Sequence, residues 1–305
     1  MRAFEAPQVL VLGGGGILGE AWMTAVLAGL SEATGFDARD CDGFVGTSAG
    51  AIVAAALSAG IEPGSRLGAL PEQPPATTAE VTADGGLPER ALGLAFTVGR
   101  GAAAPLAALG LRATETGGAA ARRAALRRVP AGRRSLDGLG RELEQAGARW
   151  DGRLTLAAVD LDSGRRVMFG ARDAPESSIA AAVEASCSIP GVFEPVVIAG
   201  RRYVDGGVWS PTNMDRAPAG RGTRVLCLNP TGSVRSSLIA PLSGLLSRSV
   251  AGVEALALER RGARVTIVSP DDASLAAIGR NLMNPARRSR VIAAGRLQAR
   301  KLAAG

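Results

Sequence analysis

The stretch "QVLVLGGGGILGEAW", Gln8 to Trp22, decides how the N-terminal part of the chain folds. It reads as a short apolar strand over Val9–Leu12, then a glycine-rich loop, then the start of a helix. The glycines have the G-x-G-x-x-G spacing of a dinucleotide-binding turn, whose backbone N–H groups hold a pyrophosphate. Such N–H groups can equally stabilise another negative charge, so this loop alone leaves both functions open.

Patterns typical of strands and helices alternate along much of the rest of the chain. This alternation predicts an α/β fold with a largely parallel sheet. The predicted hairpin joins Leu154–Leu161 to Arg166–Phe169 through the turn "DSGR". Other expected strands are Asp42–Val45, "RRYVD", "TRVLCLNP" and "ARVTIVSP", and expected helices are Glu20–Leu30, Ala49–Ser58, Ser178–Ser186, Arg248–Arg261 and Ala286–Ala304.

The amino-acid composition changes between residues 63 and 149. A Pro- and Thr-rich stretch is followed by the apolar segment Ala91–Leu111 and by an Arg-rich stretch. Arg100 lies in the middle of the apolar segment, where it would cost about 2.5–3.5 kcal/mol at a bilayer centre, so a membrane span is not favoured. We therefore expect one domain over 1–305, with a core over 7–62 and 150–270, a largely helical insertion and candidate lid over 63–149, and a C-terminal helical segment over 271–305.

The net charge of +7 favours contact with anionic surfaces, either membrane headgroups or nucleic acid. Nucleic acid is disfavoured because the chain has neither zinc-ligand spacing nor an aromatic-studded strand. The stretch "ARRAALRRVPAGRRSL" suggests peripheral contact with an anionic membrane, and the alternative is an ordinary solvated helix face. Its basic residues are Arg122, Arg123, Arg127, Arg128, Arg133 and Arg134.

The cysteines and the N-terminus favour a cytoplasmic protein. Cys41, Cys187 and Cys227 are far apart, and an odd, dispersed set is typical of a reducing compartment. The first residues also lack the pattern of a secretory signal.

A candidate nucleophile follows the second expected strand, in Gly46-Thr47-Ser48-Ala49-Gly50. This is G-x-S-x-G between a strand and a helix, the setting of a nucleophile elbow. Ser48 must lie on a sharp turn to expose its hydroxyl, and side chains at the two glycine positions would clash across that turn. The helix that begins at Ala49 places the positive end of its dipole beside the hydroxyl, where it favours developing negative charge.

The base that activates this serine cannot be histidine, because the chain contains none. A Ser-His-Asp triad is therefore impossible, and Lys301, the only lysine, lies in the C-terminal tail. Asp205 is the best-placed carboxylate, since it ends an expected strand and precedes Gly206 and Gly207, which permit a tight turn and a close approach. Burial would raise its pKa from about 3.9 and make it a better base. An ordinary D-G-G turn is the alternative.

The second strand bears on the function of the glycine loop. In a dinucleotide-binding fold, the acidic residue that binds the ribose lies at the end of that strand, whereas Asp40 and Asp42 precede the strand. The far end carries Ser48 instead. We therefore favour an oxyanion hole formed by the N–H groups of Gly14, Gly15 and Gly16.

Three ordered motifs resemble those of the patatin-like phospholipases: the G-G-G-x-x-G loop after a strand, G-T-S-A-G, and D-G-G without any histidine. "ASCSIPGVFEPV" also looks like that family's segment before the acid-bearing strand. The resemblance covers roughly 7–60 and 150–230. It implies a three-layer α/β/α fold, a Ser48–Asp205 dyad and an oxyanion hole near Gly14–Gly16.

The resemblance further implies a serine acyl hydrolase that cleaves lipid acyl esters through an acyl-enzyme, with no metal or cofactor. The chain departs from the family at Leu18, where an Arg or Lys is usual. This change predicts weaker anchoring of the loop or the loss of an anionic headgroup contact. The alternatives are an acyltransferase or thioesterase that uses the same dyad, and a catalytically weak lipid-binding relative.

Overall fold

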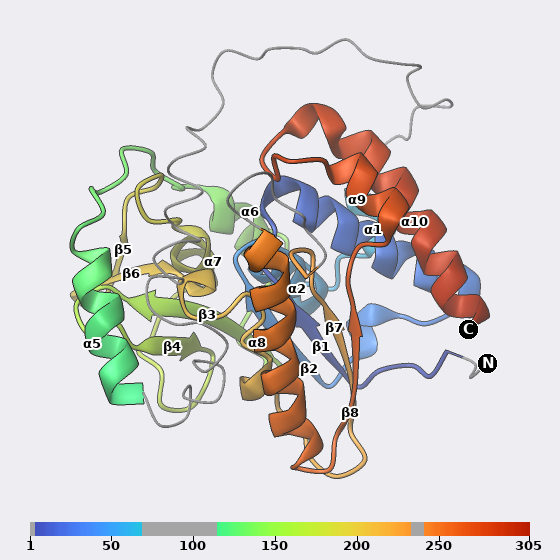
Figure 1. Ribbon diagram of the computed structural model, residues 1–305, viewed down its shortest axis with the longest axis horizontal. Coiled ribbons are helices and arrows are strands. Elements are labelled where there is room, and N and C mark those ends of the chain that lie inside the picture. Colours follow the sequence, from blue (N-terminus) through green and yellow to red (C-terminus); the bar gives the residue numbers. More distant parts are fainter. Residues whose placement is uncertain (1–3, 69–114, 233–240) are drawn as a thin grey trace.

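The computed structural model describes residues 4–68, 115–232 and 241–305. Within these ranges, eight strands form one sheet in the order β5-β6-β3-β2-β1-β7-β8, with β4 paired to β3 (Figure 1). The strands are β1 (Val9–Leu12), β2 (Gly43–Thr47), β3 (Leu154–Asp160), β4 (Arg166–Phe169), β5 (Val196–Ile198), β6 (Arg201–Asp205), β7 (Arg224–Leu228) and β8 (Arg264–Val268). The five strands β3, β2, β1, β7 and β8 are parallel, whereas β4 and β6 run antiparallel to β3, and β5 antiparallel to β6.

Helices cover both faces of this sheet, which gives three layers. The described helices are α1 (Gly16–Thr34), α2 (Ala49–Ser58), α5 (Glu115–Leu126), α6 (Leu139–Gln145), α7 (Ile179–Cys187), α8 (Pro241–Glu259), α9 (Asp272–Ile278) and α10 (Arg288–Ala304). Leu10 and Leu12 pack with α1, α2 and α7 on one face. Val9 and Val11 pack with α8 on the other, because successive strand residues point to opposite faces. The α/β/α architecture expected from the sequence is confirmed.

The C-terminal helix α10 packs closely on α1, and Figure 1 shows the two side by side. Gly29 of α1 permits this approach, since a Cβ there would lie 2.7 Å from Cβ of Ala299 and 3.2 Å from the carbonyl oxygen of Arg296. Gln298 adds a buried polar contact across this interface, where it accepts a 3.0 Å hydrogen bond from the indole of Trp22.

Strands β2 and β6 meet end to end along one edge of β3. Leu156 and Ala157 pair with both β2 and β4, and Ala158 and Val159 pair with both β4 and β6. Because a strand has only two edges, β4 must occupy one and β2 and β6 must share the other. The last residue of β2 lies beside Ala157 and the last residue of β6 beside Ala158.

The structure describes only part of the expected insertion over 63–149. It contains α5 and α6, whereas the apolar segment Ala91–Leu111 lies outside the described residues. The proposal of a lid over 63–149 thus stays a prediction. None of the helices in the described ranges has an apolar run long enough to cross a bilayer.

Two glycine substitutions test the α1–α10 contact. We expect Gly29→Ala to destabilise the protein by about 1–3 kcal/mol, because the added methyl group forces the helices apart. Gly252→Ala in α8 is the matched control, since a Cβ there meets nothing within 4 Å. It should stabilise by about 0.5–1 kcal/mol through helix propensity. Urea unfolding measures both, and equal effects would contradict the close packing.

Candidate active site

Ser48 lies on a sharp turn between β2 and α2, as the G-x-S-x-G pattern predicts. Its φ of 53° and ψ of −120° are a conformation that a residue with a side chain rarely adopts. A Cβ on Gly50 would lie 1.8 Å from the carbonyl oxygen of Leu12, and one on Gly46 would lie 2.6 Å from Cα of Ala51. Both glycines are therefore required for the turn to pack against β1 and its own helix.

The strained turn is held in place by a buried serine of α7. The hydroxyl of Ser186 accepts a 3.0 Å hydrogen bond from the backbone N–H of Ser48 and donates a 2.7 Å bond to the carbonyl oxygen of Ala157. The thiol of Cys187 contacts the carbonyl oxygen of Ser48 at 3.3 Å. These contacts tie both the N–H and the carbonyl group of Ser48 to neighbouring elements.

Asp205 is the last residue of β6, and its carboxylate lies close enough to the hydroxyl of Ser48 for that hydroxyl to lower its pKa. Oδ1 of Asp205 accepts a 2.7 Å hydrogen bond from the backbone N–H of Gly207. Gly206 permits the close approach, since a Cβ there would lie 2.4 Å from the carbonyl oxygen of Ala157. The meeting of β2 and β6 along β3 thus brings together two side chains that are far apart in the sequence.

Burial raises the pKa of Asp205 to about 6, because the charged form loses its hydration. The nearby hydroxyl of Ser48 and the hydrogen bond from Gly207 favour the charged form and act in the opposite direction. The net result is a carboxyl group that is charged at neutral pH and a stronger base than an exposed aspartate.

The glycine loop lies beside this pair, at the ends of the adjacent parallel strands β1 and β2. A Cβ on Gly14 would lie 3.5 Å from Cβ of Ser48. However, the N–H of Gly14 already donates a 2.8 Å hydrogen bond to the carbonyl oxygen of Pro211. The expectation that Gly14 donates to an oxyanion therefore needs correction, since this N–H instead anchors the loop.

The next two residues of the loop differ from Gly14. Within the described part of the chain, the N–H groups of Gly15 and Gly16 have no hydrogen-bond partner. A Cβ on Gly15 would lie 2.6 Å from Cβ of Pro230, and Gly16 has a φ of 60°, so side chains are disfavoured at both. Gly15 is the N-cap residue of α1 and Gly16 its first residue, so both N–H groups lie at the N-terminus of the helix, where the helix dipole favours negative charge.

Leu18 takes a different position from that of a headgroup-binding side chain. It is completely buried in the main core, and its N–H donates a 3.0 Å hydrogen bond to the carbonyl oxygen of Leu282. The C-terminal segment between α9 and α10 therefore helps to anchor the start of α1. Loss of the basic side chain at this position has not left the loop without support.

A small cavity of about 60 Å³ opens beside the Ser48 hydroxyl. Its polar groups are those of the glycine loop, Ser48, Asp205 and Thr231, whereas most of the remaining wall is apolar. The apolar residues are Ile189, Pro190, Val208, Pro211, Leu282 and Met283. Such a lining suits a hydrocarbon chain next to a reacting ester.

The arginine side chains of the basic stretch lie in two different environments. Arg122 is turned inward, with its guanidinium 4.0 Å from the ring centre of Trp209, and it donates to the carbonyl oxygen of Gly164 at 2.9 Å. Burial, with the nearby charge of Arg166, lowers the pKa of Arg122 to about 10. Arg122 thus does not belong to a basic outer face. The exposed members are Arg123, Arg127, Arg128, Arg133 and Arg134.

Sequence reasoning missed several residues that shape this site. Ser186 lies in the segment "ASCSIPGVFEPV", but the sequence did not assign it a role, and Met283 lies in a stretch with no motif; only the folded chain brings them to Ser48 and Gly16. Asn213 closes the segment "SPTN" that follows the D-G-G turn, and this nearness to Asp205 is the signal that the sequence offers, since the burial of its side chain is visible only in the structure. No three His, Cys, Asp or Glu side chains among the described residues are placed to hold a metal ion.

Comparison with known proteins gives two kinds of result. The chain is similar to VipD from Legionella pneumophila, with 13% identity, a TM-score of 0.42 and coverage of 99% of this chain and 67% of VipD. It is also similar to the type III effector protein ExoU, with 17% identity, a TM-score of 0.41 and coverage of 99% of this chain and 53% of ExoU. The chain thus spans about half the length of ExoU. No curated protein matches it significantly.

The family comparison is more decisive than these distant likenesses. The family model described as patatin-like phospholipase matches residues 10–218, which include the glycine loop, the turn at Ser48 and the D-G-G turn at Asp205. The match covers more than half of the sequence. The chain belongs to the patatin-like phospholipase family.

Proposed function

We propose that this protein is a lipid acyl hydrolase in which Ser48 is the nucleophile and Asp205 the general base. The observation that carries the proposal is that the Ser48 hydroxyl lies beside the buried carboxylate of Asp205, which has a raised pKa, at the same cavity. Family membership supports hydrolysis of acyl esters. The apolar cavity wall beside Ser48 supports a lipid substrate.

The first half of the reaction forms an acyl-enzyme. Asp205 takes the proton of the Ser48 hydroxyl as its oxygen attacks the ester carbonyl carbon. The carbonyl oxygen becomes negative, and the free N–H groups of Gly15 and Gly16 donate hydrogen bonds to it. The tetrahedral intermediate then collapses, the ester C–O bond breaks, and the leaving alcohol receives the proton from Asp205.

The second half releases the acid and restores the enzyme. Asp205 takes a proton from a water molecule, whose oxygen attacks the acyl carbon. The bond between that carbon and the Ser48 oxygen breaks, and the serine regains its proton from Asp205. The net reaction consumes one water molecule and yields a carboxylic acid and an alcohol.

Removal of either dyad residue should abolish hydrolysis. We expect Ser48→Ala and Asp205→Asn each to lower kcat/KM by at least about 10³-fold, because the nucleophile or its base is lost. The assay uses p-nitrophenyl esters of graded chain length and phospholipid vesicles. A fluorophosphonate probe should label the wild type on the peptide that contains Ser48.

Two substitutions serve as controls for these variants. Ser58→Ala removes a serine at the other end of α2, and Asp162→Asn removes an exposed carboxylate paired with Arg202. Both should retain wild-type activity. Substantial hydrolysis by Ser48→Ala would show that another group is the nucleophile.

The pH dependence of kcat/KM should report the protonation of Asp205. With a pKa of about 6, activity should fall roughly tenfold per pH unit below pH 6 and level off above it, because only the charged carboxylate accepts the proton. No imidazole can account for such a limb, since the chain has no histidine. Among the described residues, Glu254, whose pKa burial raises to about 7, is the other carboxyl in this range. A midpoint that stays near 6 in Glu254→Gln assigns the limb to Asp205, and a midpoint near 4 contradicts the proposal.

The buried base should also reduce stability at neutral pH. Its folded-state pKa lies above the unfolded value, so the native state binds more protons between pH 4 and 6, and stability falls as pH rises through this window. Asp205→Asn avoids this loss and should raise the free energy of unfolding at pH 8 by up to about 3 kcal/mol, with little gain at pH 4. Urea unfolding at both pH values measures the difference. A variant less stable than wild type at pH 8 would contradict the assignment of a charged, poorly solvated carboxylate.

A further inference from the structure

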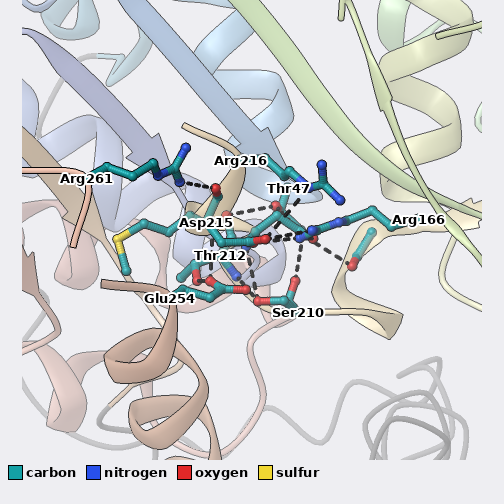
Figure 2. A network of polar contacts seen from close by, with 11 residues as sticks. Thr47, Arg166, Ser210, Thr212, Asp215, Arg216, Glu254 and Arg261 are labelled. Atoms are coloured by element: carbon teal, nitrogen blue, oxygen red, sulfur yellow. Dashed lines mark hydrogen bonds and ion pairs between the residues drawn. The ribbon is translucent and has the colours of Figure 1, made fainter. Parts of the chain in front are cut away.

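A buried network of polar groups lies behind the dyad, on the side of the sheet covered by α8. Figure 2 shows side chains of Thr47, Arg166, Ser210, Thr212, Asp215 and Glu254 in this network. It joins the segment after β6 to the turn before Ser48, although these segments are about 165 residues apart. At its centre is Asn213, whose side chain is completely buried.

The Asn213 carboxamide contacts both turns of the dyad. Its Nδ2 donates to the hydroxyl oxygen of Thr47 at 3.1 Å, to the carbonyl oxygen of Ser210 at 2.8 Å and, more weakly, to that of Gly206 at 3.4 Å. Thr47 directly precedes Ser48, and Gly206 directly follows Asp205. One amide nitrogen therefore bridges the residue next to the nucleophile and the residue next to the base.

Arg166 fixes the orientation of that amide. Its Nη1 lies 3.1 Å from Asn213 Oδ1, and because a guanidinium only donates hydrogen bonds, the amide oxygen must face it. Arg166 is held by two 2.7 Å hydrogen bonds to the carboxylate of Asp215 and lies over the ring of Trp209. The nitrogen of the amide is thus directed toward the two turns.

The backbone of Asn213 is anchored as well. It has a φ of 49° and ψ of 29°, a left-handed conformation that asparagine tolerates better than most residues. Its N–H donates to the hydroxyl of Ser210 at 3.1 Å, and the next N–H, that of Met214, donates to Glu254 of α8 at 2.9 Å. Glu254 also accepts a hydrogen bond from the hydroxyl of Thr212. The segment that presents the amide is therefore tied to α8.

We propose that Asn213 is a positioning residue, whose buried carboxamide sets the separation between the Ser48 hydroxyl and the Asp205 carboxylate. β3 aligns the ends of β2 and β6, but the two strands share no hydrogen bonds with each other. The amide supplies a direct link across that gap. The consequence for catalysis rests on the proposed function, whereas the consequence for the geometry of the pair does not.

The test deletes the amide without disturbing the backbone. Asn213→Gly retains the left-handed conformation and adds no charge. We expect kcat to fall about 10–100-fold with KM changed less than about threefold, because a small misplacement of the base affects the transition state more than binding. Asn213→Asp, which keeps the shape but loses both donors, should behave similarly and replaces Asn213→Gly if that variant fails to fold.

Gln298 provides the matched control. Its buried carboxamide lies between α1, α9 and α10, away from Ser48 and Asp205. It accepts hydrogen bonds from Trp22 and Ser274 and donates one to the carbonyl oxygen of Ser269. Gln298→Ala should lower the melting temperature yet leave kcat within twofold of wild type. A kcat in Asn213→Gly that also remains within twofold would overturn the proposal, as would a loss explained entirely by the unfolded fraction.

A readout independent of turnover separates this proposal from the proposed function. The nearby Ser48 hydroxyl lowers the pKa of Asp205, so a wider gap should raise that pKa. Carbon-detected NMR titration of the Asp205 carboxyl should therefore give a higher pKa in Asn213→Gly than in wild type or Gln298→Ala, and an unchanged pKa overturns the proposal. Full activity of Ser48→Ala would instead overturn the proposed function and leave this titration valid.

Discussion

The site depends on one constraint of the sheet, the end-to-end meeting of β2 and β6 along the same edge of β3. Thr47 lies beside Ala157 and Asp205 beside Ala158, so the two strands approach from opposite directions and stop at adjacent positions. Neither strand can continue without colliding with the other, and both chains turn away at this point. Ser48 and Asp205 occupy these turns, which explains why the side chains of residues 157 positions apart in the sequence lie beside each other.

The parts of this arrangement that follow from local backbone chemistry were predictable from the sequence. Val9–Leu12 and Ala49–Ser58 were expected with the bounds that the structure gives, because glycines end the strand and the helix follows a turn that only G-x-S-x-G permits. The elbow is the clearest example, since Gly46 and Gly50 are required by contacts within 3 Å of the backbone. Such steric requirements restrict neighbouring positions to particular residue types, and this restriction is visible in the sequence as a short, specific pattern.

The parts that depend on tertiary packing were not predictable in the same way. The N–H of Gly14 looks equivalent to those of Gly15 and Gly16 in the sequence, yet Pro211 engages it from a segment about 200 residues away. Arg122 has the helical spacing of the exposed arginines around it, but Trp209 and Gly164 hold it inward. Leu18 suggested a weaker loop, and the hydrogen bond to Leu282 supplies the anchor from the C-terminal segment. In each case the partner is distant in the sequence, and no local sequence pattern identifies it as the partner.

The absence of histidine explains why the polar network around Asn213 matters for the proposed mechanism. An imidazole titrates near neutral pH without help, whereas a carboxylate becomes an adequate base only when burial raises its pKa. Burial removes the water that would otherwise solvate Asp205 and leaves it the Ser48 hydroxyl and the N–H of Gly207 as polar neighbours. Water cannot then adjust the distance between the proposed base and the proposed nucleophile, so fixed protein dipoles must set that distance. A rigid amide such as that of Asn213, itself oriented by an ion pair, supplies a fixed dipole at the point where the two turns meet. In the proposed mechanism, a buried aspartate as base therefore requires the polar network behind it.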